Sequence, residues 1–265
     1  MLTDIFSAGA TIFYGVSLFF VLKNLFDHSQ VSDKLVFSIA GVAIVFHAGA
    51  LGSSILAFEG QNMSILAVAS IVSWIIATML TVALPRFAIA TLLPVVYGFA
   101  LFAVVGLWLV PSSYITHFET HPEVLIHICL ALSAYSTMVI AAFYAIQLWI
   151  IDKRLKSKKL NLALSPLPPL LTVEKQLFQL VLAGVILLTL SLATGFFFLE
   201  DMFAQGKAHK AILSLAAWSL YSYLLWRHYS RGVRIKIAVQ FTISGAILLT
   251  LAYFGSRLVS EILIH

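Results

Sequence analysis

The sequence is poor in charged residues and in cysteine. Of its 265 residues only 10% are charged, whereas 61% are hydrophobic, and soluble domains do not have this composition. A single cysteine, Cys129, excludes an internal disulfide and a CxxC redox pair. Walker, HExxH and GxSxG motifs are absent, so we do not expect an ATP-driven or hydrolytic enzyme.

Carboxylates are missing from the interiors of the long hydrophobic runs. A buried Asp or Glu is the usual proton or sodium site of an ion-coupled transporter, so this absence disfavours that class. The first residues, MLTDIFSAGA, carry no basic stretch before the apolar run. We therefore expect a first membrane span here and not a cleaved signal peptide.

Eight hydrophobic stretches are long enough to cross a bilayer, which takes about 20 residues in a helix. They are residues 5–22, 35–58, 64–84, 87–110, 123–151, 177–199, 209–226 and 236–256. Backbone groups in lipid must bond within the segment, so these stretches are predicted to be helices. The sequence thus predicts an all-α polytopic protein with one integral membrane domain over residues 1–265. The fifth helix is long enough to project from the outer face.

The loops between these stretches alternate in charge. One set is basic and the other is not, which by the positive-inside rule makes the basic set cytoplasmic and places both termini in the periplasm. The basic set holds Lys23, Lys34, Arg86, Lys153, Arg154, Lys156, Lys158, Lys159, Lys175, Arg227, Arg231, Arg234 and Lys236, and the other set holds Lys207, Lys210 and Arg257. The net charge of +5 therefore serves topology and anionic lipid headgroups, and no nucleic-acid partner is expected.

Histidines are the ionisable side chains that the spans do contain. His47 lies about a dozen residues from each end of its span, near the bilayer midplane, where polar groups are costly. It shares a helical face with Ala40, Ala43, Ala50 and Ser54. Such small residues admit either a neighbouring helix or a flat ligand. His47 is therefore either a packing residue bonded to a neighbouring hydroxyl or a metal or haem ligand.

Three further histidines are candidate ligands. His127 begins a helical face that continues with Ala131, Ala134 and Ala145, near the outer rim. His228 ends the seventh span at the cytoplasmic side, where an interfacial aromatic belt is the simpler interpretation. His117, with His121 and Glu119, lies in the outer loop 111–122, but no further ligand cluster closes a metal site there.

The segment from Tyr114 to Asp152 contains HICLALSAYSTMVIAA, a histidine followed by a helix with small residues, Ser and Tyr. Residues 217–236, AWSLYSYLLWRHYSRGVRIK, end in a histidine and a basic, Gly-containing turn. Both stretches resemble the cytochrome c assembly (CcsA/ResC/HemX-like) membrane protein family. QNMSIL, LLPVVYGFA, PPL and LAYFGSR resemble its short, eight-helix YpjD-type inner membrane proteins over essentially the whole chain.

This resemblance implies a multi-pass protein of the bacterial inner membrane that handles haem b at the outer face and supports cytochrome c maturation proteins, without being an enzyme. His127 and His228 match the family's histidines as candidate axial ligands, and His47 is added by the YpjD-type pattern. His127 and His228 should lie about 30 Å apart across the core, too far to share an iron. The expected pair is therefore His127 with His47 or with His117, in the outer leaflet.

Two features depart from the larger members of the family. The tryptophans lie within or at the ends of spans, so a tryptophan-rich outer motif is absent, and the last helix exits as GSRLVSEILIH without an outer histidine. Both departures bear on haem delivery more than on haem binding. They leave open a membrane regulator or scaffold linked to tetrapyrrole metabolism. A small-solute transporter using His47 is a further alternative, disfavoured by the missing carboxylates.

Overall fold

The structure, a computed structural model, describes residues 2–27, 31–56, 59–87, 89–112, 114–118, 122–157, 168–198 and 208–255. These residues form eight α-helices, two short paired strands and one π-helical turn. The prediction of an all-α fold with eight helices is confirmed. Contacts within the chain divide it into two compact units, Met1–Thr120 (unit 1) and His121–His265 (unit 2).

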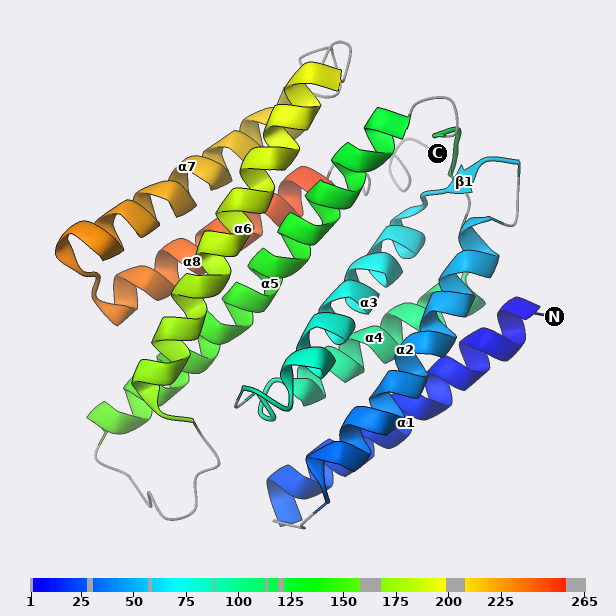
Figure 1. Ribbon diagram of the computed structural model, residues 1–265, viewed down its shortest axis with the longest axis horizontal. Helices are drawn as coiled ribbons and strands as arrows, with labels where there is room; N and C mark the ends of the chain where they lie inside the picture. The colour runs from blue at the N-terminus through cyan, green and yellow to red at the C-terminus, as the bar shows by residue number, and fades with distance from the viewer. Residues whose placement is uncertain are drawn as a thin grey trace. The chain divides into compact units, whose positions relative to one another are not determined.

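Unit 1 is a ring of four helices. They are α1 (Leu2–Asp27), α2 (Asp33–Ile55), α3 (Ile65–Ala83) and α4 (Leu93–Leu109), each packed on the next, with α4 returning to α1 (Figure 1). Ser32 and Ser64 cap α2 and α3 by accepting from the backbone N–H of Lys34 and Ala67. At one end of the ring, β1 (Gln61–Asn62) pairs antiparallel with β2 (Ile115–Thr116).

Unit 2 is a second ring with the same order of neighbours. It consists of α5 (Pro122–Lys156), α6 (Leu170–Phe198), α7 (Ala208–Arg231) and α8 (Ile235–Thr250), which continues as the π-helical turn Leu251–Gly255. Consecutive helices pack on each other, and α8 closes the ring against α5. Both units are thus up-and-down four-helix bundles, although the sequence contains no recognisable repeat.

Six of the described helices are long and apolar enough to cross a membrane: α1, α2, α3, α5, α6 and α8 with its π-helical turn. The predicted fourth and seventh spans are also helical, but α4 has 17 residues and α7 carries more polar side chains than the others. At 1.5 Å per residue α4 measures about 26 Å, slightly less than the hydrocarbon core. The multi-pass architecture is therefore shown by six helices directly.

Five helix boundaries differ from the predicted spans by five residues or more. Two of them are the ends of α1 and α7, at Asp27 and Arg231, each five residues later than predicted. Helix α4 begins at Leu93 instead of residue 87, because residues 84–86 and 90–92 form turns and Pro94 fits only the first turn of a helix. Helix α6 begins at Leu170, directly after Pro168 and Pro169. Helix α5 runs from Pro122 to Lys156. Its extra residues therefore follow the predicted end at residue 151, where the basic residues lie, and the expected projection at the other end is wrong.

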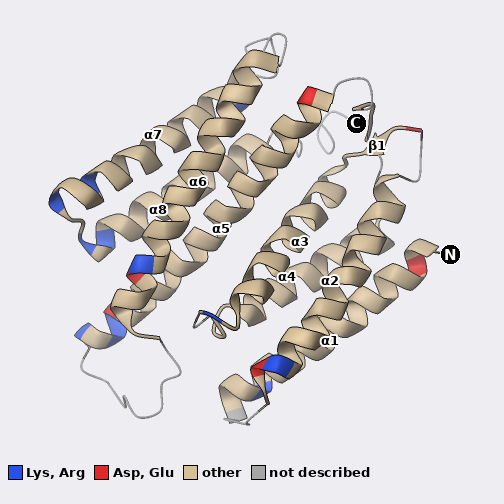
Figure 2. Ribbon diagram, in the orientation of Figure 1, with Lys and Arg blue, Asp and Glu red and all other residues tan. Residues whose placement is uncertain are grey.

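The surfaces of both units match a hydrocarbon surrounding. Large apolar side chains lie fully outside, among them Val45, Phe102 and Phe197, which are 69%, 75% and 76% exposed. Polar side chains such as Ser70 and Thr242 are buried instead. Lys and Arg gather at one end of each bundle, with Lys210 near the start of α7 as an exception (Figure 2). This pattern is typical of helices that span a membrane.

The packing of α7 on α8 gives a stability prediction. A Cβ atom at Gly245 would lie 2.5 Å from the ring of Tyr221, which is fully buried and cannot move aside. We expect Gly245→Ala to destabilise the protein by about 1–3 kcal/mol through overpacking, measured as a lower thermal unfolding midpoint in detergent. Gly98→Ala is the matched control, because its Cβ would meet no atom within 4 Å. Equal stability of the two variants would contradict this packing.

Candidate functional site

His127 lies in the second turn of α5 and is half-buried against α6. Its Nδ1 lies 2.9 Å from the carbonyl oxygen of Ser191 and 3.3 Å from Oγ1 of Thr194. A carbonyl oxygen can only accept, so Nδ1 carries the proton and donates it to Ser191. The lone pair of a neutral imidazole is then on Nε2, which no residue in the described part of the chain bonds.

This arrangement suits a metal-binding histidine. Histidines that ligate iron or zinc commonly donate their other ring N–H to a backbone carbonyl, which fixes the tautomer and the ring orientation. His127 with the Ser191 carbonyl has this donor set, so its chemistry fits axial ligation of haem iron through Nε2. The residues that hold His127 in place, Ser191 and Thr194, were not identified from sequence. These two residues follow His127 by 64 and 67 positions in the sequence, and only the packing of α6 on α5 brings them next to it.

His47 has different surroundings. It is completely buried in unit 1, with Nε2 2.8 Å from Oγ of Ser70 in α3 and Nδ1 3.3 Å from the hydroxyl of Tyr14 in α1. The Tyr14 ring packs edge-on against the imidazole and lies 6.0 Å from the ring of Tyr97 in α4. The Tyr97 hydroxyl in turn bonds Thr81 at 3.0 Å. These five side chains join all four helices of unit 1.

This network does not fit His47 as a haem ligand. Both ring nitrogens are already hydrogen-bonded, and the small residues on its face, Ala40, Ala43 and Ala50, are fully buried against neighbouring helices. Of the two interpretations of the sequence pattern, the packing histidine bonded to hydroxyls describes this geometry. On the small-residue face of α5, Ala134 and Ala145 are also fully buried, whereas Ala131, one turn after His127, is only half-buried.

His228 lies in the last turn of α7, and its ring stacks on Phe178 of α6 with centroids 3.4 Å apart. Its Nδ1 is shielded from solvent and has no hydrogen-bond partner among the described residues. Along α6, Phe178 lies 13 residues from Ser191, the contact of His127. At 1.5 Å per residue this separates the two histidines by about 20 Å along the bundle. That is less than the 30 Å expected from the sequence, but it still excludes a shared iron.

His117 follows β2 and is exposed. Its ring lies beside Gly60, whose φ of +101° makes the turn before β1. Strand pairing between β1 and β2 therefore holds this part of the loop 111–122. His121 and Glu119 lie outside the described residues. No group of three or more His, Cys, Asp and Glu side chains in the described ranges could hold a metal ion.

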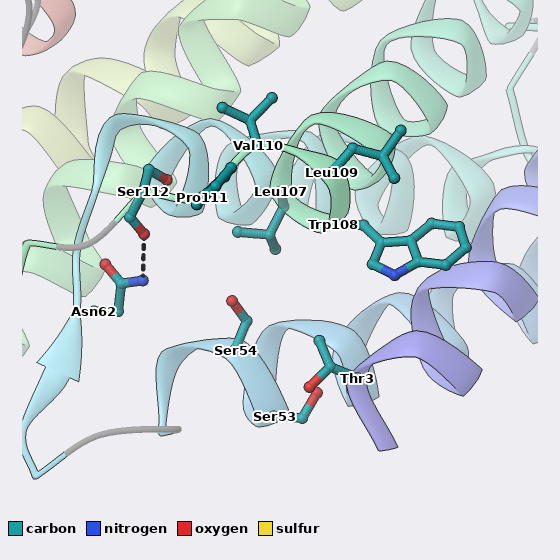
Figure 3. A pocket seen from close by; sticks show the side chains of 10 residues that line it. All are labelled: Thr3, Ser53, Ser54, Asn62, Leu107, Trp108, Leu109, Val110, Pro111 and Ser112. Carbon is teal, nitrogen blue, oxygen red and sulfur yellow. Dashed lines mark hydrogen bonds between the residues drawn. The ribbon is translucent and has the colours of Figure 1, made fainter. Parts of the chain in front are cut away.

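A pocket of about 490 Å³ lies at the end of unit 1 that carries the strands (Figure 3). Its wall contains the Trp108 indole, the hydroxyls of Thr3, Ser53 and Ser54, and the Asn62–Ser112 pair. No histidine lines it, so it offers no imidazole ligand to an iron. None of the four candidate histidines is brought into contact with another by the described structure of either unit.

The chain is similar to two named bacterial proteins. The chain is 42% identical over 261 residues to the inner membrane protein YpjD of Escherichia coli strain K12, which covers 98% of the chain and 99% of that protein. An uncharacterized 28.8 kDa protein of Azospirillum brasilense, encoded in a nifR3-like 5′ region, is 30% identical over 141 residues, 52% of each chain. No solved structure matches the chain.

A family model decides the classification. The model of the cytochrome c assembly protein family matches residues 35–264, from the third residue of α2 to the next-to-last residue of the chain. The match includes His47, His127 and His228, together with all of unit 2 except its final residue. With its described helices and its near full-length relative, the chain is a multi-pass inner membrane protein, and it belongs to the cytochrome c assembly protein family.

Proposed function

We propose that this chain is a haem-binding membrane protein that handles haem b in support of cytochrome c maturation, and that it is not a turnover enzyme. The observation that carries the proposal is the bond from His127 Nδ1 to the Ser191 carbonyl, which leaves Nε2 as the lone-pair donor. Membership of the cytochrome c assembly family supports the same function. The test is an absorbance spectrum of the purified protein in mild detergent, before and after haem is added.

His127 would hold the haem iron, and the backbone of α6 would hold His127. When bound, haem would supply an iron centre that accepts an imidazole nitrogen and can change its oxidation state. The Ser191 carbonyl keeps the Nδ1 proton in place, so the ring presents the same nitrogen outward. Thr194 adds a second contact at 3.3 Å that restrains rotation of the ring. Folded protein in detergent that shows no Soret band after haem is added would contradict the proposal.

The alternative is a regulator or scaffold without haem delivery. The network in unit 1 supports it, because both ring nitrogens of His47 are hydrogen-bonded there and neither is available to bind iron. Its contact surface would be the basic end of α5, where Lys153 and Arg154 are exposed. This alternative and the haem-binding function differ in one measurement, since only the latter requires a Soret band in the wild-type protein.

We further propose that the basic ends of both bundles face the cytoplasm and that both termini face the periplasm. The basic residues of α1, α2, α5, α6, α7 and α8 support this orientation, because Lys and Arg near span ends are retained on the cytoplasmic side. An alkaline phosphatase domain fused after residue 265 should be active, and one inserted at residue 162 should be inactive. The opposite activities would reverse the topology.

A further inference from the structure

The pocket at the strand end of unit 1 is bordered by the carboxyl ends of two helices. Ser53 and Ser54 lie in the last turn of α2, and residues 107–109 are the last three of α4. The last four carbonyl oxygens of a helix have no partner within the helix and give that end a partial negative charge. The C-cap N–H groups occupy only the carbonyls of Gly52 and Gly106, and neither helix has a basic residue in its last turn. Both ends therefore favour a cation.

The helix amino ends beside the pocket do not require an anion in return. Helix α1 has Asp4 in its first turn, and α3 is capped by Ser64, whose own N–H is accepted by the Asn62 side chain at 3.1 Å. No charged residue in the described ranges lines the pocket. The Lys and Arg residues of unit 1 that the structure describes lie at its other end (Figure 2): Lys23, Lys34 and Arg86. The pocket thus has more acceptors than donors and no positive charge of its own.

The wall of the pocket carries open hydrogen-bond acceptors. No described residue bonds the hydroxyl groups of Thr3 and Ser54, and the Ser53 hydroxyl donates to a carbonyl of its own helix and keeps its lone pairs. Figure 3 shows these three hydroxyls on one side of the pocket and Leu107 and Val110 on the other. A primary ammonium group has three N–H donors and no acceptor, so it can bond several of these oxygens at once. A quaternary ammonium group has no such donor.

The indole of Trp108 adds a surface that attracts cations. Among aromatic side chains tryptophan attracts an ammonium group most strongly, within about 6 Å of the ring centre. Its Nε1 donates to Oδ1 of Asp4 at 3.0 Å, which fixes the ring at the pocket. The volume of about 490 Å³ lies in the range of small-molecule sites, about 300–1,000 Å³, and exceeds what a bare metal ion fills. These features fit a small organic cation.

The pocket adjoins the surface that faces lipid. Leu109 and Val110, which line it, are 65% and 52% exposed, and Leu2 and Ile5 at the start of α1 are 65% and 54% exposed. A tryptophan at the end of a membrane helix lies at the level of the lipid headgroups. The source of ammonium groups nearest to the pocket is therefore the headgroup layer.

We propose that this pocket binds the primary ammonium group of a zwitterionic phospholipid of the phosphatidylethanolamine class. The hydroxyls of Thr3 and Ser54 and the helix carbonyls accept its N–H groups, and Trp108 lies beside its charge. Phosphatidylcholine should bind more weakly because its ammonium cannot donate, and phosphatidylglycerol because it has no cation. The site lies in unit 1 and does not depend on haem binding by His127. A free amine could supply the same chemistry, so the experiment compares both sources.

The test uses the full-length protein in nanodiscs of phosphatidylcholine mixed in equal parts with phosphatidylethanolamine or with phosphatidylglycerol. Native mass spectrometry counts the lipids that stay bound after mild activation. Wild type should retain phosphatidylethanolamine, and the double variant Thr3→Val, Ser54→Ala should bind it at least about tenfold more weakly, the loss expected for hydrogen bonds to a charged group. Ser38→Ala removes an exposed hydroxyl near the other end of α2 and should bind as wild type does.

Trp108→Leu keeps an apolar side chain but removes the aromatic ring, so it should also weaken the retention of phosphatidylethanolamine; it serves as the second variant if the double variant does not fold. Equal retention of phosphatidylethanolamine and phosphatidylglycerol by wild type, or undiminished retention of phosphatidylethanolamine by the double variant, would overturn the proposal. Ethanolamine titrated into nanodiscs of phosphatidylcholine alone is the other arm. A rise in melting temperature there that depends on Thr3 and Ser54, without retained phosphatidylethanolamine, would overturn the lipid assignment.

Discussion

Purified protein carrying His127→Ala is expected to show no Soret band after haem supplementation, whereas the wild-type protein shows one. Removing the group that hydrogen-bonds a metal-ligating histidine typically weakens metal affinity by about 10–100-fold, and removing the histidine itself weakens it further. We therefore expect haem affinity to fall by at least about a hundredfold. The loss of bound haem is measured from the difference spectrum of the reduced and oxidised protein, with the haem content expressed per folded protein.

A matched control is His209→Ala. His209 is an exposed histidine at the start of α7, in the same unit, and its removal should leave the Soret band unchanged. Thr194→Val removes the 3.3 Å contact to Nδ1 and keeps the Ser191 carbonyl, so a partial loss of about tenfold is expected. Free imidazole added to the His127→Ala protein should restore part of the band, a rescue that a purely structural role would not give. An intact band in His127→Ala would refute the assignment.

His47→Ala is expected to lower the stability of the protein by about 2–4 kcal/mol while the haem content of the folded fraction stays at the wild-type level. The loss has two sources. The substitution opens a cavity at a completely buried position, and it leaves Ser70 and the Tyr14 hydroxyl without their partner in the membrane interior. Thermal unfolding in detergent, followed by circular dichroism, measures the change.

A double-mutant cycle separates the network from the cavity. Tyr14→Phe removes only the hydroxyl that bonds Nδ1 and should cost about 1 kcal/mol alone. Combined with His47→Ala it should cost less than the sum of the two, because the shared bond is lost once. Val45→Ala, at a position of the same helix that is 69% exposed, should leave stability nearly unchanged. Loss of haem from folded His47→Ala protein would instead restore His47 as a ligand.

The helices could be predicted from the sequence because the features that form and end a helix lie close together in the sequence. The long apolar runs that predicted the spans each lie in one continuous stretch of the sequence. The residues that set helix ends in the structure also act over a few positions: Ser32 and Ser64 as caps, and Pro94, Pro168 and Pro169 as boundary residues. The errors in the boundaries have local causes too. The run from residue 87 to 92 is apolar enough for a helix, but the prolines on either side of it, Pro85 and Pro94, favour turns.

The roles of the histidines could not be predicted in the same way. His47 and His127 have similar sequence surroundings, each followed by small residues along one face. One is enclosed by the hydroxyls of Tyr14 and Ser70, and the other donates to a backbone carbonyl of α6. Tyr14 and Ser70 are 33 and 23 positions from His47 in the sequence, so no local sequence pattern predicts that they bond it.

By itself the sequence determined that this chain is a bundle of apolar helices with an uneven distribution of basic loops, because hydrocarbon imposes those requirements on every span separately. It also placed the chain in its family. Only the tertiary structure decided which imidazole keeps a ring nitrogen free of hydrogen bonds to the described residues. That property depends on which groups of other helices lie within hydrogen-bond distance, and helix pairing sets that distance.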